Sequence, residues 1–218
     1  MAEASFAVAL ALLGAGVGML AEAWATYALR GKAVAAGRSS SRLLSAGIAS
    51  GLCAWAGFRF EAADSEWVAF VGLVFVLLTV SITDLRAMLI PNAVVFPSVA
   101  AAILIRLFAN PLPFWHYAAG ALIGFVLLYA LSAASRGGVG GGDVKLYLFV
   151  GLLCGLQATL LSLFVASLAA TAFGLGARLV GRRRRTIPFG PFIALGAIAA
   201  VLYGERWIEA YSVYFGIA

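Results

Sequence analysis

Acidic side chains at the ends of long apolar segments are the residues of this sequence that could do chemistry. Asp84 follows the apolar run 67–83 and opens a short stretch that ends in Pro91 and Asn92. Pro91 cannot continue a helix from upstream but can begin one, so we expect the next helix to start there. Taken alone, Asp84 could equally be a helix-end acid paired with Arg86. Asn92 could either orient a site or cap the next helix.

Asp143 ends a glycine-rich loop and is followed by Lys145. The three glycines directly before it are Gly140, Gly141 and Gly142. Aspartate is a favoured N-cap, so capping of the following helix is one interpretation. Glycines also allow close approach of another chain, so such a loop could admit an extended peptide beside the carboxylate. Phosphate binding fits less well, because no Gly-Lys-Ser/Thr follows and an acid at the helix start repels phosphate. Lys145 could stabilise a carboxylate pair or anchor the chain at lipid phosphates.

The two aspartates together predict more than either does alone. Ionisable groups near a bilayer are costly and usually functional. Two carboxylates brought close cannot both ionise cheaply, so the pair can share one proton. The ionised member would act as a general base on a water, while the protonated member polarises a peptide carbonyl. The pattern predicts peptide hydrolysis without a metal or a covalent intermediate, and it leaves open which aspartate carries the proton.

The elements that position these residues must lie in a membrane. Of the 218 residues, 64% are hydrophobic and 11% are charged, against about 25% charged residues in a soluble domain. A backbone in lipid satisfies its own hydrogen bonds, so each long apolar run is expected to be a helix. We predict an all-α polytopic membrane bundle of eight transmembrane helices, at about 4–29, 42–59, 67–83, 92–109, 114–134, 144–156, 158–180 and 189–204. The boundary at Gly155–Gln157 is weak, which makes seven helices the main alternative.

Basic residues are distributed unevenly between the expected loops. Twelve of the fifteen fall on one side of the membrane and three on the other. The twelve are Arg30, Lys32, Arg38, Arg42, Arg86, Arg136, Lys145, Arg178, Arg182, Arg183, Arg184 and Arg185; the three are Arg59, Arg106 and Arg206. The bias predicts that the first side is cytoplasmic and that both termini are periplasmic. It requires 144–180 to cross twice and puts both aspartates at the cytoplasmic face. We expect anionic lipids, and no nucleic acid, as partners of these loops.

Three short motifs follow one another along the chain. They are Ile90-Pro91-Asn92 at the end of the stretch that Asp84 opens, Gly140-Gly141-Gly142-Asp143-Val144-Lys145-Leu146, and Ile187-Pro188-Phe189-Gly190-Pro191-Phe192. The first two resemble the first-aspartate and Gly-x-Gly-Asp motifs of type IV prepilin peptidases. The third resembles that family's C-terminal Pro-Phe-Gly-Pro segment, and the order is the family's. Pro188, Gly190 and Pro191 are expected to shape a helix entry near the site, or simply to start a helix.

The resemblance implies an aspartyl endopeptidase of the bacterial inner membrane with Asp84 and Asp143 as its catalytic pair. Its substrates would be the prepilins or pseudopilins of type IV pili or type II secretion, cleaved after a short basic leader at the cytoplasmic face. The chain would then divide into two N-terminal helices with a short basic loop, 1–66, and a peptidase domain, 67–218. Glu22, in the first helix, could be an accessory acid or the partner of an arginine.

The resemblance is incomplete in the first third of the chain. Long family members carry paired Cys-x-x-Cys motifs after the first helix, linked to zinc and to methylation of the new N-terminus. The loop from Arg30 to Ser41 has no cysteine. We therefore expect no zinc, no other cofactor and no N-methyltransferase activity.

Other functions compete with this interpretation. A presenilin-like protease also uses Gly-x-Gly-Asp, but it has Tyr-Asp in the partner helix, where this chain has Thr83 before Asp84. A transporter with two coupling carboxylates would place them near the membrane midplane. An inactive relative that only scaffolds pilus assembly is a third possibility, although the two aspartates are present.

Overall fold

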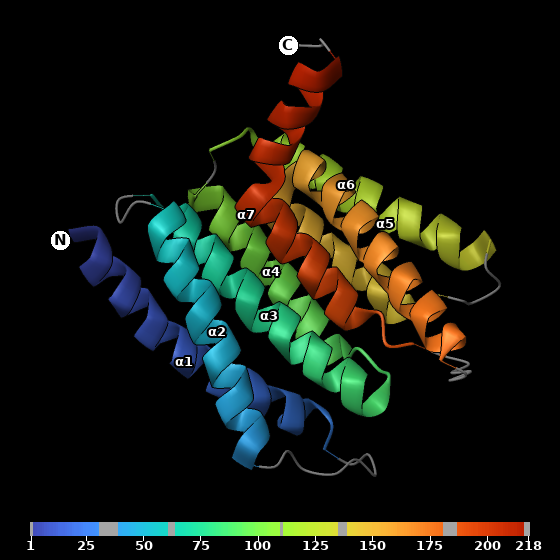
Figure 1. Cartoon of the computed structure of the whole chain (residues 1–218), viewed down its shortest axis with the longest axis horizontal. Coiled ribbons are helices and arrows are strands. Elements are labelled where there is room, and N and C mark those ends of the chain that lie inside the picture. The colour runs from blue at the N-terminus through green and yellow to red at the C-terminus, as the bar shows by residue number, and fades with distance from the viewer. Residues whose placement is uncertain are drawn as a thin grey trace.

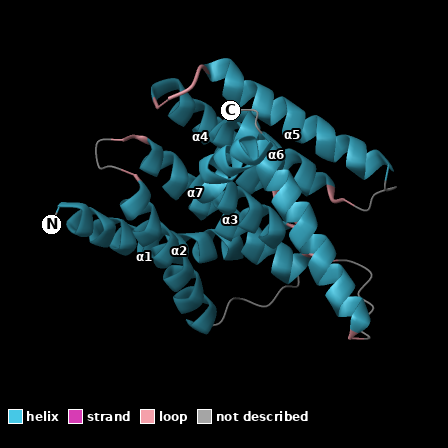
Figure 2. Ribbon diagram, turned by 45° about the horizontal axis from the view of Figure 1, so that its top comes forward, coloured by secondary structure: helices cyan, strands magenta, loops and turns pink. Residues whose placement is uncertain are grey.

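The computed structural model describes residues 2–30, 39–60, 64–109, 111–134, 139–180 and 187–215. Within these ranges the chain forms seven helices and no strand, so the expected all-α architecture is confirmed (Figures 1 and 2). The helices are α1 (Ala2–Ala28), α2 (Ser39–Arg59), α3 (Glu66–Ala87), α4 (Asn92–Phe108), α5 (Phe114–Ala134), α6 (Gly141–Leu179) and α7 (Gly190–Phe215).

Five of the described helices are long and apolar enough to cross a membrane. They are α1, α3, α5, α6 and α7, while α4 is apolar but shorter. The chain is thus a multi-pass membrane protein. The basic residues Lys32, Arg38, Arg136 and 182–185, on which the predicted orientation largely depends, lie outside the described residues. The orientation, with periplasmic termini, stays a prediction.

Helix α6 folds back on itself at Gly155. Its 39 residues would extend about 58 Å as a straight helix, roughly twice the hydrocarbon thickness of a bilayer. The hydroxyls of Tyr147 and Ser162 nevertheless lie 3.4 Å apart, although a straight helix would separate these residues by about 22 Å. The two arms therefore run side by side, gold and orange in Figure 1.

The reversal depends on glycine. Gly155 has φ 78° and ψ 176°, a backbone conformation that side chains with a Cβ rarely adopt. A Cβ at this position would also lie 2.8 Å from the His116 ring. The two segments expected at 144–156 and 158–180 are thus joined in one element without a polar loop. The count of eight membrane crossings stays a prediction.

The last helix is longer than expected. We predicted that it ends at 204, but α7 continues to Phe215. Gly204 does not break it, because the following residues can all be helical and Tyr203 stacks on Trp207 with ring centroids 6.1 Å apart. A single glycine inside a helix costs only about 1 kcal/mol relative to alanine.

Neighbouring helices pack closely, α1 on α2 and α5 on α6. A Cβ on Gly18 of α1 would overlap the backbone carbonyl of Ser45 in α2, and a Cβ on Gly151 of α6 would overlap Ala121 of α5. Small residues at such contacts let helices in lipid approach closely, where packing rather than the hydrophobic effect drives association. The main core cluster joins α3, α4, α5, α6 and α7. The predicted division at 66/67 stays a prediction.

Candidate active site

Asp84 lies in the last turn of α3 and points to the start of α7. Its side chain is 6% exposed, and its Oδ2 accepts a hydrogen bond from the backbone N–H of Gly190 at 2.7 Å. Gly190 is the first residue of α7, and the partial positive charge of a helix N-terminus stabilises a carboxylate there. A Cβ on Gly190 would lie 3.0 Å from this same Oδ2. Glycine thus allows α7 to reach the carboxylate.

The chain turns sharply between Asp84 and α4. Met88 is in the left-handed conformation with φ 48° and donates its N–H to the carbonyl of Asp84 at 2.8 Å, which ends α3. Pro91 is the N-cap of α4 and Asn92 is its first residue, so the expected helix start is confirmed to within one residue. The alternative that Asn92 is the cap is wrong, because its Oδ1 instead accepts a hydrogen bond from Lys145 at 3.3 Å.

Asp143 lies in the first turn of α6, beside the glycine loop. Gly140 is the N-cap of this helix, so the alternative that Asp143 is the cap is wrong. Asp143 is 7% exposed, and its buried Oδ1 accepts no hydrogen bond from the residues that the structure describes. A Cβ on Gly140 would come within 2.9 Å of its other oxygen, Oδ2. This loop therefore packs directly on the carboxyl group.

The structure brings the two aspartates to one end of the bundle, which we call the aspartate end. Asp84 is in the last turn of α3 and Asp143 is in the first turn of α6. A Cβ on Gly142 would lie 2.7 Å from Cβ of Ile90, so the glycine loop packs on the segment that follows Asp84. Both carboxyl groups are thus buried at the same end of the bundle, the placement expected of a pair that shares a proton.

The other predicted site residues lie around this pair. Pro188 and Pro191 flank Gly190, and the N–H groups of Phe192 and Ile193 both donate to the carbonyl of Phe189 at 3.0 Å. A Cβ on Gly141 would meet open space. Lys145 points to Asn92, and its Nζ lies 5.8 Å from the Phe96 ring centroid. Among the described residues, Lys145 forms no ion pair with Asp84 or Asp143.

Glu22 is close to the aspartate end but not in contact with the pair. It forms an ion pair with Arg86. The alternative that Arg86 pairs with Asp84 is therefore wrong. Residues two apart on a helix face away from each other, and Arg86 accordingly points to α1 while Asp84 points to α7.

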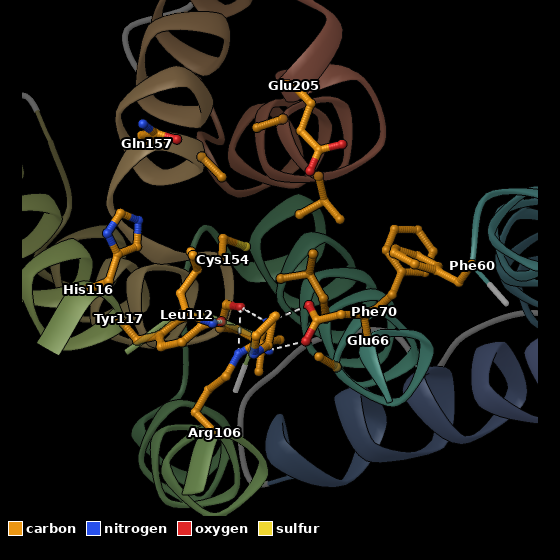
Figure 3. A pocket seen from close by; sticks show the side chains of 18 of the residues that line it. Phe60, Glu66, Phe70, Arg106, Leu112, His116, Tyr117, Cys154, Gln157 and Glu205 are labelled. Carbon is orange, nitrogen blue, oxygen red and sulfur yellow. Dashed lines mark hydrogen bonds and ion pairs between the residues drawn. The ribbon is translucent and has the colours of Figure 1, made fainter. Parts of the chain in front are cut away.

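A second polar region, drawn in Figure 3, lies around Glu66 at the start of α3, the end of this helix opposite to Asp84. A cavity of about 470 Å³ there is lined by Glu66, Arg106, His116 and Gln157, among others, and by neither Asp84 nor Asp143. Arg106 is 3% exposed, forms an ion pair with Glu66 and donates from Nε to the carbonyl of Leu153 at 3.0 Å. Arg106 falls within the helix expected at 92–109, but its charge was counted with the loops on the periplasmic side. The signal missed was an arginine within an apolar helix, which needs a partner when it faces the protein interior.

No group of three or more His, Cys, Asp or Glu side chains is arranged to hold a metal ion within the described ranges. Cys53 and Cys154 are free thiols.

Comparison with known proteins gives a consistent family assignment. Residues 71–175 match the model of the type IV leader peptidase family. A prepilin leader peptidase/N-methyltransferase of Bacillus subtilis (strain 168) is 39% identical over 166 residues, which are 73% of this chain and 65% of that protein. The protein of that name from Aeromonas salmonicida (strain A449) is 32% identical over 145 residues, 62% of this chain and 50% of that protein.

The match thus covers between half and two thirds of the length of these relatives. No solved structure gives a significant match. Both aspartates lie within the matched residues, as does the bend at Gly155 that returns α6 to the aspartate end. The segment 71–175 therefore belongs to the type IV leader peptidase family.

Proposed function

We propose that this chain is a membrane aspartyl endopeptidase that removes the leader peptide from prepilin-like or pseudopilin-like precursors. Asp84 and Asp143 are its catalytic pair. The observation that carries the proposal is the hydrogen bond from Gly190 to Asp84, at 2.7 Å, together with the burial of Asp143 at the same end of the bundle. The names of the relatives, which are leader peptidases of prepilins, supply the substrate class.

The environments of the two carboxyl groups suggest their roles. The N–H of Gly190 at the start of α7 stabilises a negative charge on Asp84. Oδ1 of Asp143 has no donor among the described residues and is available for a proton. In this mechanism Asp84 removes a proton from water, and the resulting hydroxide attacks the scissile carbonyl. Asp143 donates a hydrogen bond to that carbonyl oxygen, and the departing amine then takes up a proton from the pair as the C–N bond breaks.

The substrate would enter beside the glycine loop, from the cytoplasmic face of the inner membrane. Basic residues flanking the expected loops support this orientation. The same loops would contact anionic lipids. Hydrolysis at the end of the bundle needs no water at the membrane midplane, which agrees with both aspartates lying at helix termini. The methyl transfer in the relatives' names is not part of the proposal, because residues 30–41 lack cysteine.

The test is co-expression of the full chain with a candidate prepilin and mass spectrometry of the prepilin N-terminus. Asp84→Asn and Asp143→Asn each keep the side-chain shape and remove the acid. Glu209→Gln, at an exposed position of α7, is the matched control that also removes one acid. We expect both aspartate variants to leave the leader attached and the control to remove it. Complete leader removal by either aspartate variant would refute the proposal.

A further inference from the structure

The aspartate end contains a buried charge cluster that the hydrolytic mechanism does not use. Glu22 of α1 forms an ion pair with Arg86 of α3 and accepts a hydrogen bond from Ser41 of α2 at 2.9 Å. Arg86 also donates to Ser41, at 3.2 Å. Glu22 is 1% exposed, so water barely screens the pair. We call these three residues the Glu22 clamp.

The last turn of α3 is bound to a different helix on each side. Asp84 and Arg86 are two residues apart, so their side chains project about 200° from each other around α3. Asp84 is bound to Gly190 of α7 on one side, and Arg86 is bound to Glu22 on the other. The last turn of α3 is therefore held between two helices that come from opposite ends of the sequence.

Helices α1 and α2 are closely packed around Glu22. Its neighbours Ala21 and Ala25 are fully buried, and Ser45 of α2 donates to the carbonyl of Gly18 at 3.0 Å. A Cβ on Gly18 would overlap the backbone of α2. The carboxylate of Glu22 thus has little freedom to follow a shift of α3. It can act as a fixed point for the turn that presents Asp84.

We infer that Glu22 is a positioning residue for the catalytic pair, acting through Arg86 on the position of Asp84. The inference rests on the proposed function. It assigns a role in the reaction to α1 and α2, which lie outside the segment 71–175 that matches the family. A buried ion pair often stabilises a protein no more than neutral groups of similar size would. The positioning of Asp84 is a reason for such a pair to be present at this place.

A second ion pair on the same helix supplies the control. Glu66, the first residue of α3, pairs with the buried Arg106 at the end of this helix opposite to Asp84 (Figure 3). Both pairs tie α3 to another helix, but only the Glu22 clamp adjoins the turn that holds Asp84. Loss of the Glu66 carboxylate should therefore affect folding without moving the catalytic group.

The experiment measures kcat and KM for prepilin cleavage by the purified full chain, per folded molecule, and its Tm. We expect Glu22→Gln and Arg86→Gln to lower kcat by about 10- to 100-fold, because a displacement of about 1 Å costs that much. KM should change by less than about threefold. The double variant should be no slower than either single variant, because both act through one contact. Glu66→Gln should lower Tm and leave kcat within about twofold.

The outcomes separate this inference from the proposed function. Unchanged kcat in Glu22→Gln, with Asp84→Asn inactive, would overturn the positioning role alone. Equal losses of kcat in Glu22→Gln and Glu66→Gln would also overturn it, since the effect would then be a general one on folding. Cleavage by Asp84→Asn would remove the proposed function and this inference together.

A milder variant covers the case in which Glu22→Gln does not fold. Ser41→Ala removes the hydrogen bond that Ser41 donates to Glu22 and the one that it accepts from Arg86, and it leaves the ion pair in place. We expect it to lower kcat by at least about fivefold, since one hydrogen bond contributes about 1 kcal/mol and two are lost, with KM nearly unchanged. Wild-type kcat in Ser41→Ala would count against the positioning role.

Discussion

The most specific prediction concerns Gly190→Ala. Its new Cβ would lie 3.0 Å from Oδ2 and 3.1 Å from Cβ of Asp84, and 3.3 Å from Cγ1 of Val80. These separations are a few tenths of an ångström too short, so Asp84 must move away from the N–H that it accepts. A hydrogen bond to a charged group contributes about 1.5–3 kcal/mol. Weakening it should therefore lower kcat by about 10- to 100-fold.

The assay is cleavage of a prepilin by the purified variant, normalised to folded protein. Gly141→Ala is the matched control, because a Cβ at Gly141 meets nothing within 4 Å. The control should keep kcat within about twofold, and Tm should stay close to wild type in both variants. If Gly190→Ala cleaves at the wild-type rate, the contact between α7 and Asp84 is not what prepares this carboxylate.

Two further predictions concern glycine packing, and a third concerns methylation of the product. Gly142→Ala should reduce cleavage more than Gly141→Ala, measured in one assay, because its Cβ would lie 2.7 Å from Cβ of Ile90; equal activities would contradict this. Gly155→Ala should lower Tm by several degrees, corresponding to a strain of about 1–3 kcal/mol at its φ of 78°; an unchanged Tm would show that the bend does not need glycine. Pilin processed by this protein alone should lack the roughly 14 Da of one methyl group, since residues 30–41 contain no cysteine; a methylated N-terminus would show transferase activity.

Local sequence patterns predicted the helices well where a helix is bounded by polar residues. The apolar run before Asp84 and the proline at position 91 marked the end of α3 and the start of α4 to within a few residues. The bend of α6 was harder to predict, because Gly155 lies inside an apolar run. The charge pattern required two crossings there, and the contact between Tyr147 and Ser162 shows that the helix does reverse.

The contacts between residues far apart in the chain were not predicted from the sequence. The motif with Gly190 suggested a place near the site, but not that its N–H binds Asp84, 106 residues earlier. Arg86 was expected to pair with Asp84 or to lie in a loop, whereas the fold brings Glu22 to it from α1. Arg106 was counted with the loop charges because it ends an apolar run. In the structure Arg106 donates to the carbonyl of Leu153, two residues before the bend of α6, and no local pattern predicts that contact.

The most direct test of the carboxyl pair is a proximity measurement. Asp84→Cys and Asp143→Cys are combined in a chain with Cys53→Ala and Cys154→Ala, and a protease site is inserted between α4 and α5. Carboxyl groups that shift each other's protonation lie within about 4–6 Å, so a thiol cross-linker of about 5 Å reach should keep the two halves joined after proteolysis. Glu66→Cys with Asp143→Cys, from opposite ends of the bundle, should not cross-link. Failure of the first pair to cross-link, with both thiols shown to be reactive, would contradict a shared site for the two aspartates.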